Sequence, residues 1–371
     1  MPADDSTTAL RRDRLRSRIR ELDADAALIT NLINVRYLTG FTGSNAALIV
    51  GADPADDLFS TDGRYVEQSK AQVPDVPLLI GRASAQAVAA EVGQRLGTIA
   101  YETHSVSVDV AEALQDAAPA ARLVSLGAAV EGLRAIKDDE EIALLRQAAH
   151  IADQALTELI EAGGIIPGRS ERDIAIDLDF RMLRLGAEEV SFETIVATGP
   201  NSAIPHHRPG ERVLESGDLG KIDFGATYRG YHSDMTRTYG VGSIADWQRE
   251  IYEAVASAQR AGAQALRIGR TGKEVDTVSR DIIADAGYGE TFAHSLGHGV
   301  GLEVHEAPNL SQLSETKLED RVCVTVEPGV YLAGRGGVRI EDTLVLREDA
   351  EADGATRTDL LTMTSKDLVI L

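Results

Sequence analysis

The sequence of 371 residues has one cysteine, Cys323, and no long apolar run. A single cysteine excludes an intramolecular disulfide and any zinc site built from several thiolates. It indicates a protein of a reducing compartment, so we expect a cytoplasmic location. No apolar stretch approaches the roughly 20 residues that cross a bilayer. The N-terminus is polar and acidic without the apolar core of a signal peptide, so we also expect no secretion signal.

Positive charge is scarce as well, since 37 Lys and Arg face 59 Asp and Glu, for a formal net charge of -22. This balance argues against nucleic acid or an anionic membrane surface as a partner. The length is sufficient for two domains that each bury a core. Composition alone therefore indicates an acidic soluble enzyme with two domains.

Short β-favouring runs alternate with alanine-rich helical segments over the first third of the chain. These runs are Ala26–Thr30, Ala46–Val50, Asp57–Asp62, Val76–Ile80, Thr98–Glu102 and Ala121–Ser125. Strands that alternate with helices predict an α/β domain. Only His104 of the eight histidines lies here, so we expect residues 1–130 to have a structural or pocket-shaping role and residues 131–371 to be catalytic.

The second part of the chain contains an internal repeat. Long helical patterns begin at Asp139 and again at Asp246. A Gly-Arg-Ser turn at Gly168 is matched by a Gly-Arg-Thr turn at Gly269, and each opens a further helix. A β-hairpin with carboxylates follows in both copies. The repeat predicts two α+β halves whose hairpins face each other, with four carboxylates around one cavity.

The first of these hairpins is predicted over Lys221–Arg237. Folding it about the bond between Tyr228 and Arg229 places Asp223 directly across from Asp234, where paired Cβ atoms lie about 5 Å apart. Two ionised carboxylates at that distance repel by roughly 3 kcal/mol at an effective dielectric near 20, unless a proton or cation lies between them. The pairing therefore favours a divalent metal site.

The second hairpin, over Val324–Asp342, is centred on Gly334, with Glu327 and Glu341 equidistant from that centre. Between the hairpins, glycines flank His298 in the run 297–301. No Gly-Lys-Ser/Thr follows and the pattern GxGxxG is absent, so a nucleotide site is disfavoured. The glycines fit a backbone that closely approaches a buried metal, to which His298 would add an imidazole.

Several segments together match the pattern of one known family. They are 223–225, 230–237, 297–302 with 305–306, 326–331 and 337–342, together with 201–206 and 37–44. On these segments, which cover nearly the whole chain, the sequence resembles the pita-bread metallopeptidases. The greatest similarity is to the proline-specific branch of aminopeptidase P and prolidase. The resemblance implies an α/β creatinase-like N-terminal domain and an α+β pita-bread domain built from two duplicated halves.

The resemblance also implies a set of ligands for two divalent metal ions, with Asp234 and Glu341 bridging them. The ligands would be Asp223, Asp234, His298, Glu327 and Glu341. Four carboxylates and one imidazole suit manganese, cobalt, iron or zinc, and of these we expect manganese. Two such ions roughly 3.5–4 Å apart lower the pKa of a bridging water. The resulting hydroxide would attack the peptide carbonyl, with Glu327 as proton acceptor.

Further roles implied by the resemblance concern three residues outside the ligand set. His206 and His305 would hold the substrate and stabilise the oxyanion. His207 is an alternative to its neighbour, although the family pattern favours His206. Strand alternation, rather than the resemblance, leads us to expect Arg339 on the same sheet face as Glu341, where either a supporting salt bridge or a contact with a substrate or ligand carboxylate fits it equally. His232 has no assigned role, and His294 is expected to be structural.

The leading hypothesis is a peptidase that releases the residue before a proline, and its preference for dipeptides or longer peptides stays open. The full ligand set disfavours creatinase chemistry, and the N-terminal domain disfavours methionine aminopeptidase. A metal-dependent hydrolase of small non-proline amides and a non-catalytic interaction protein are the alternatives. The resemblance implies a homodimer or a dimer of dimers, with a proline-containing peptide as the substrate.

Overall fold

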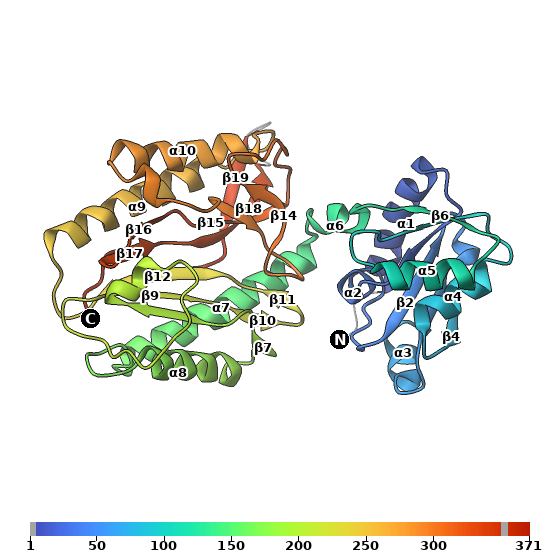
Figure 1. Cartoon of the computed structure of the whole chain (residues 1–371), viewed down its shortest axis with the longest axis horizontal. Coiled ribbons are helices and arrows are strands. Elements are labelled where there is room, and N and C mark those ends of the chain that lie inside the picture. Colours follow the sequence, from blue (N-terminus) through green and yellow to red (C-terminus); the bar gives the residue numbers. More distant parts are fainter. Residues whose placement is uncertain (1–4, 350–354) are drawn as a thin grey trace. The chain divides into compact units, whose positions relative to one another are not determined.

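The computed structural model in Figure 1 describes residues 5–349 and 355–371. The chain divides into two compact units, Met1–Arg134 and Ala135–Leu371. The predicted boundary at residues 130 and 131 stays a prediction at the level of single residues. Within the described parts of the chain, the helices are too short or too polar to cross a bilayer.

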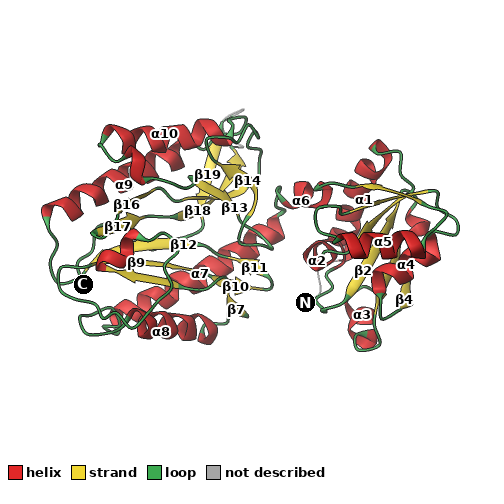
Figure 2. Ribbon diagram, in the orientation of Figure 1, coloured by secondary structure: helices red, strands yellow, loops and turns green. Residues whose placement is uncertain are grey.

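The first unit is a mixed sheet of six strands in the order β4-β3-β2-β1-β5-β6, with helices packed around it (Figure 2). Its strands are β1 (Ala26–Ile29), β2 (Ala46–Gly51), β3 (Leu58–Thr61), β4 (Leu78–Ile80), β5 (Thr98–Tyr101) and β6 (Arg122–Ser125). Its helices are α1 (Asp5–Glu21), α2 (Leu32–Thr39), η1 (Pro54–Asp56), α3 (Val66–Gln72), α4 (Ser84–Val92), α5 (Val108–Ala117) and α6 (Ala129–Arg134). The predicted α/β class of this part is confirmed.

The second unit contains two halves of the same plan, in which a pair of helices packs beside a sheet. The first half consists of α7 (Asp139–Glu161), α8 (Glu171–Arg184), β7 (Glu189–Val190), β8 (Ile195–Thr198), η2 (Gly199–Ala203), β9 (Leu219–Phe224), β10 (Ala226–Tyr228), β11 (Tyr231–His232) and β12 (Met235–Gly240). The second half consists of α9 (Asp246–Ala265), α10 (Gly272–Asp285), η3 (Gly289–Thr291), β13 (Gly297–Gly299), β14 (Glu306–Leu310), β15 (Cys323–Val326), β16 (Gly329–Leu332), β17 (Gly336–Arg339), β18 (Asp342–Glu348) and β19 (Thr356–Leu360). In Figure 1 the strands lie between α7 and α8 on one side and α9 and α10 on the other.

The predicted duplication is confirmed by details that recur in both halves. Ser170 caps α8 and Thr271 caps α10, each through its hydroxyl. The same two residues form isolated bridges, Ser170 to Val213 and Thr271 to Lys317. The main sheets also correspond, since β12-β9-β8 in the first half matches β18-β15-β13 in the second. Cys323 is buried in β15.

The predicted register of the first hairpin was wrong. Thr236, and not Asp234, lies opposite Asp223. The turn residues are Arg229 and Gly230, with φ of 49° and 75°, and positive φ at both positions is typical of a type I′ turn. The midpoint therefore lies one residue later than predicted, and the partner of Asp223 moves by two residues. Asp234 keeps the same sheet face as Asp223 and lies diagonal to it.

The predicted register of the second hairpin is confirmed. The pairs of β16 with β17 and of β15 with β18 share a single register centred on Gly334. Glu327 and Glu341 fall between these two ladders, at matching positions. Both hairpins thus break their ladders where a carboxylate is presented, which leaves those side chains free of regular sheet packing.

Gly225 allows the close approach of strands beside Asp223. A Cβ at Gly225 would lie 1.9 Å from the carbonyl oxygen of Ser233, whereas a Cβ at Gly220 in the same sheet would meet no described atom within 4 Å. We therefore predict that Gly225→Ala lowers the free energy of unfolding by about 2 kcal/mol or more, the cost of overpacking. Denaturant unfolding measures this, with Gly220→Ala as the control. Equal stability of the two variants would contradict the prediction.

Candidate active site

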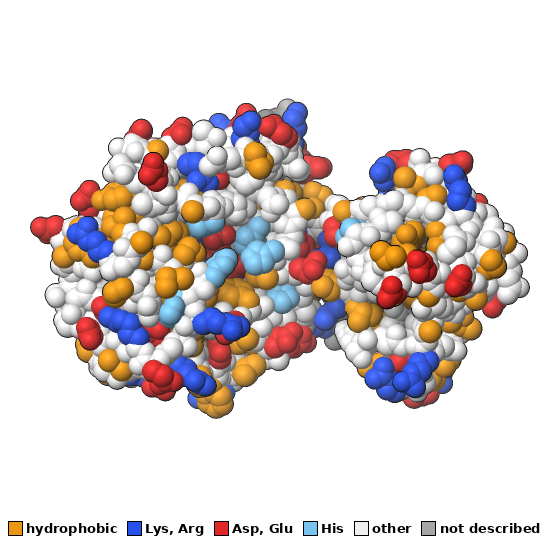
Figure 3. All heavy atoms as spheres, viewed as in Figure 1, with side chains coloured by type: hydrophobic (Ala, Val, Ile, Leu, Met, Phe, Trp, Pro, Cys, Tyr) orange, Lys and Arg blue, Asp and Glu red, His pale blue; other side chains and the backbone are white. Residues whose placement is uncertain are grey.

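A cavity of about 340 Å³ opens on the second unit. In Figure 3, pale-blue histidine side chains gather around a hollow on this unit. The cavity is lined by all eight predicted site residues, namely Asp223, Asp234, His298, Glu327, Glu341, His206, His305 and Arg339. The expected meeting of four carboxylates around one cavity is therefore confirmed as geometry, while the role of each residue stays a prediction.

Both halves of the fold contribute to the floor of the cavity. Asp223 is the penultimate residue of β9, and Asp234 immediately precedes β12. Glu327 follows β15, and Glu341 lies between β17 and β18. His298 is the middle residue of β13. Because each residue lies in or beside a buried strand, the backbone positions of the five are fixed by the two sheets.

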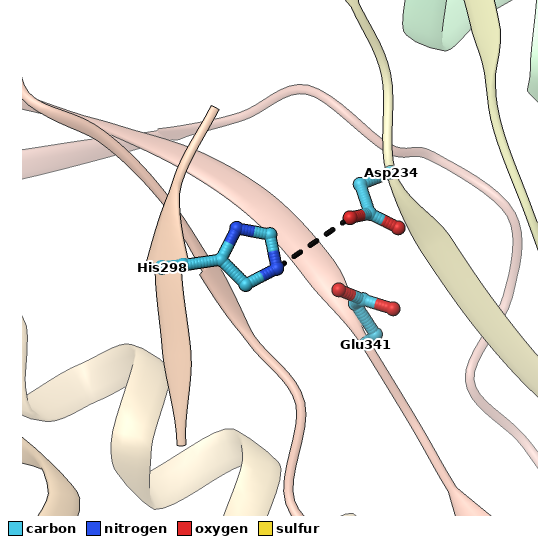
Figure 4. Close-up of side chains that lie close together, drawn as sticks. All are labelled: Asp234, His298 and Glu341. Carbon is cyan, nitrogen blue, oxygen red and sulfur yellow. Dashed lines mark ion pairs between the residues drawn. The ribbon is translucent and has the colours of Figure 1, made fainter. Parts of the chain in front are cut away.

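His298 points its Nε2 atom at carboxylates from both halves. Its Nδ1–H donates to the carbonyl of Gly299 at 3.0 Å, which leaves Nε2 facing Glu327 at 3.4 Å and Asp234 at 3.6 Å. Figure 4 shows His298, Asp234 and Glu341 directed toward one another. A backbone acceptor on the far nitrogen is the usual way in which a protein orients a metal-binding imidazole.

The carboxylates raise one another's proton affinity. Burial raises the pKa of Asp234 well above its ordinary value, and the charge of Asp223 adds to this effect. Burial likewise raises the pKa of Glu341, with a further contribution from Asp234. Burial alone would raise the pKa of Glu327, but the hydrogen bond and charge of His298, together with the charges of His294 and Arg339, lower it. A group of buried carboxylates with such opposed shifts needs a positive counter-charge.

The donor set fits a divalent metal ion. Asp234, His298 and Glu341 each offer a ligand atom within 4.8 Å of the other two. Asp223 adds a buried carboxylate oxygen, Oδ1, that has no hydrogen-bond partner among the described residues. An orphaned buried oxygen beside a cluster of oxygen and imidazole donors matches the preferences of manganese, cobalt, iron or zinc.

Arg339 is held by the protein on several sides. Its guanidinium pairs with Asp223 and donates to the hydroxyl of Tyr331 at 2.9 Å. Its Nε donates to the hydroxyl of Thr236 at 3.0 Å, and that hydroxyl donates to Glu341 at 2.7 Å. Of the two roles considered for Arg339, these contacts favour the supporting salt bridge. Thr236 was not anticipated, although its place two residues after Asp234 puts it on the same strand face.

The adjacent histidines 206 and 207 have different surroundings. His207 donates from Nε2 to the buried carboxylate of Glu171 at 2.7 Å, while His206 is an exposed residue of the cavity wall. His305 stacks edge-on against His298, with ring centroids 4.3 Å apart. Burial lowers the pKa of His305, as does the positive charge of His298, so its imidazole is neutral at pH 7.

His294 and His232, which have no predicted site role, are held by hydrogen bonds. His294 hydrogen-bonds to the carbonyl of Ser295 at 2.8 Å and to the hydroxyl of Tyr331 at 2.9 Å, which suits the structural role expected for it. His232 hydrogen-bonds to the hydroxyl of Ser191 at 2.9 Å. The cavity wall also includes residues that the sequence analysis missed, namely Phe192, Glu193, Ile195, Arg208 and Val304. Ile195 begins β8, whereas the other four come from irregular segments, where no periodicity marks which way a side chain points.

Comparison with known proteins adds a family to this geometry. Residues 143–348 match metallopeptidase family M24, and residues 11–136 match the creatinase/prolidase N-terminal domain. An uncharacterized peptidase of Bacillus subtilis, YqhT, is 42% identical over 361 residues, covering 97% of this chain and 99% of that protein.

Solved structures agree with the sequence matches. The Xaa-Pro dipeptidase from Bacillus anthracis superposes with a TM-score of 0.90 at 39% identity, covering 98% of this chain and 100% of the other. The X-Pro aminopeptidase from Thermotoga maritima MSB8 has a TM-score of 0.86 at 35% identity, covering 96% and 100%. The likeness extends over both compact units, and the predicted fold class is confirmed.

The protonation of His298 predicts how stability depends on pH when metal is removed. Burial alone would lower its pKa, but the hydrogen bond and charge of Glu327, with the charge of Asp234, raise it to about 9. A raised folded-state pKa gives stability that is complete below the ordinary value of 6.5 and is lost as pH rises through about 9. We therefore predict that the chelated protein loses thermal stability over this range.

A divalent ion would replace that proton on Nε2, so stabilisation by added manganese should increase with pH over the same range. Thermal unfolding of chelated and manganese-loaded protein between pH 7 and 9.5 measures both trends. His150→Ala, at an exposed position of α7, is the control for general effects of removing a histidine. Parallel pH profiles with and without metal would count against His298 as a ligand.

Proposed function

This chain belongs to metallopeptidase family M24 and is a peptidase, and we propose that it hydrolyses the bond between an N-terminal residue and a following proline. The observation that carries the proposal is the cavity itself, where four carboxylates and His298 converge beside His206 and His305. The proposed preference for proline is supported by the two full-length structural relatives, which are named as Xaa-Pro enzymes.

We propose that Asp223, Asp234, His298, Glu327 and Glu341 hold two divalent ions, manganese first, with Asp234 and Glu341 shared between them. The raised pKa values of Asp234 and Glu341 support this, because two cations would relieve the repulsion that raises them. When bound, such a pair supplies Lewis acidity and a water of lowered pKa for attack on an amide carbonyl.

The chain's own residues would provide proton transfer and orientation. Glu327 lies at the edge of the cluster, half-buried, and its lowered pKa keeps the carboxylate ionised and able to accept a proton from the attacking water at an Oε atom. His305 is neutral and lines the cavity, where its N–H could donate to the oxygen on which negative charge develops. His206, which lies on a different segment of the cavity wall from His305, would also hold the substrate carbonyl.

Proline at the second position changes what a peptidase can contact. The bond before proline is a tertiary amide without an N–H, and the ring fixes φ near -65°. An enzyme that relies on that N–H cannot hold such a substrate, whereas imidazole donors directed at the carbonyl oxygen do not need it. The apolar wall of Phe192, Ile195 and Val304 offers a surface for the pyrrolidine ring.

A hydrolase of small amides that lack proline would use the same cluster and is the second candidate. The relatives' names include both a dipeptidase and an aminopeptidase, so the preferred peptide length is for experiment to decide. The cytoplasmic location and the homodimer or dimer of dimers expected from the resemblance stay predictions.

We predict that the chelated protein cleaves Ala-Pro and Ala-Pro-Ala only after manganese is restored, and leaves Ala-Ala-Ala intact. We expect this because the metal ions would supply the nucleophilic water, and the apolar cavity wall would select the pyrrolidine ring of proline. Release of alanine from matched concentrations measures this, and the dipeptide-to-tripeptide ratio separates prolidase from aminopeptidase P. Equal cleavage of Ala-Ala-Ala would support the amide hydrolase, and no cleavage with any metal would support a non-catalytic protein.

We also predict that His305→Ala lowers kcat by about 10²-fold, the usual cost of removing one oxyanion donor. Bound metal, measured by elemental analysis, should be unchanged, because His305 is not among the proposed ligands. His150→Ala on the surface of α7 is the matched histidine control. Full activity of His305→Ala, or a loss explained by lost metal, would remove the proposed role.

A further inference from the structure

The segment 199–210 leads from β8 along the cavity wall and carries both His206 and His207. Its only regular structure is the short η2, so its shape depends on partners outside the segment for its backbone groups. Two polar side chains, Glu171 and Lys221, both 0% exposed, meet it from different elements.

Glu171, the first residue of α8, accepts hydrogen bonds from both ends of the segment. Its Oε1 accepts from the backbone N–H of Thr198 at 2.8 Å and from the side-chain amide of Asn201 at 2.9 Å. Its Oε2 accepts from His207 at 2.7 Å and from the N–H of Gly210 at 3.2 Å. Burial alone would raise the pKa of Glu171, but the hydrogen bonds from Asn201 and His207 lower it, so the carboxylate is ionised.

Lys221 in β9 holds the middle of the segment. Its Nζ donates to the carbonyls of Ile204 at 2.7 Å and Pro205 at 3.2 Å, the two residues immediately before His206. The carbonyl of Pro205 also accepts from Arg339 at 3.2 Å. A buried lysine is costly unless its donors are used, and here they are used by the backbone that leads into His206.

The duplicated half shows that neither the turn nor the helix start requires a residue like Glu171. Gly272 follows Thr271 as Glu171 follows Ser170, and α10 still begins with a capping box. A Cβ at Gly272 would lie 2.2 Å from the carbonyl oxygen of Asn309, so the later segment packs directly against that helix start. In the first half a buried carboxylate occupies this space and reaches the segment that carries His206.

We propose that Glu171 and Lys221 are positioning residues, which fix the segment 199–210 and thereby place His206 at the cavity. Their anchoring contacts reach none of the five proposed ligands, and their effect on catalysis would come through the position of His206. The catalytic part of this inference rests on the proposed function, whereas the anchoring part stands on the contacts themselves.

Hydrogen exchange followed by mass spectrometry tests the anchoring without any substrate. In E171Q the new amide group faces two donors, His207 and the N–H of Gly210, and K221M keeps the side-chain length but removes the donor. Exchange within 198–210 should speed up about tenfold in both variants, as expected when a buried hydrogen bond is lost. Unchanged exchange in this segment would overturn the proposal, whatever the activity.

The matched control is D153N. Asp153 is also a buried carboxylate, 8% exposed, and it accepts from the backbone N–H groups of Met363 and Thr364, away from the segment. Exchange in 198–210 should be normal in D153N. Faster exchange there would show a general loosening and would overturn the specific role of Glu171. If E171Q does not fold, N201A can replace it, because this variant removes the hydrogen bond from Asn201 to Glu171 and should also speed up exchange in 198–210.

A double-mutant cycle with H206A then tests the link to catalysis. E171Q should lower kcat/KM for Ala-Pro by about 10- to 100-fold, the usual range for a misplaced group, but by less than about twofold in the H206A background. In the double variant D153N/H206A, the effects of the two substitutions on kcat/KM should instead multiply. Independent effects of E171Q and H206A, or loss of bound metal in E171Q, would overturn the proposal. If exchange is faster in the two variants but the unmodified protein cleaves no proline peptide, the anchoring role of Glu171 and Lys221 would still hold and the proposed function would be overturned.

Discussion

The repulsion among buried carboxylates is the constraint on which this structure depends. Asp234 and Glu341 come from different halves of the duplicated fold, and burial with mutual charge raises the pKa of both. Only a cation, or protons, can hold these groups together. His298 and Arg339 meet part of the need from the protein side. The remaining deficit is the physical reason why a divalent cation suits the cavity.

The duplication explains how so many charged groups reach one place. Each half brings a hairpin whose ladder is interrupted at a carboxylate, and the interruption frees the side chain to face the other half. Thr236 then links the halves, since it lies opposite Asp223, accepts from Arg339 and donates to Glu341. A sheet that paired without interruption would bury these groups among its own neighbours and leave no shared centre.

The halves are alike in plan but differ around their histidines. His305 and His298 lie close together and influence each other's charge, whereas His206 lies on a segment held from outside by Glu171 and Lys221. The cavity therefore combines a rigid floor of strands with one wall whose position depends on two buried side chains. Strands fix the proposed metal ligands, and the anchored wall would fix the substrate.

The sequence by itself determined the α/β class of the first unit, the repeat of the second and the register about Gly334, because these follow from local periodicity, caps and glycine turns. It also marked the four carboxylates. Tertiary structure alone decided the register of the first hairpin, where Arg229, which is not glycine, adopts a positive φ that no local pattern announces. It alone revealed Glu171 and Lys221 as anchors, since their partners lie across gaps in sequence that no periodicity spans. Contacts of that kind are set by how elements pack, and packing is a property of the whole chain.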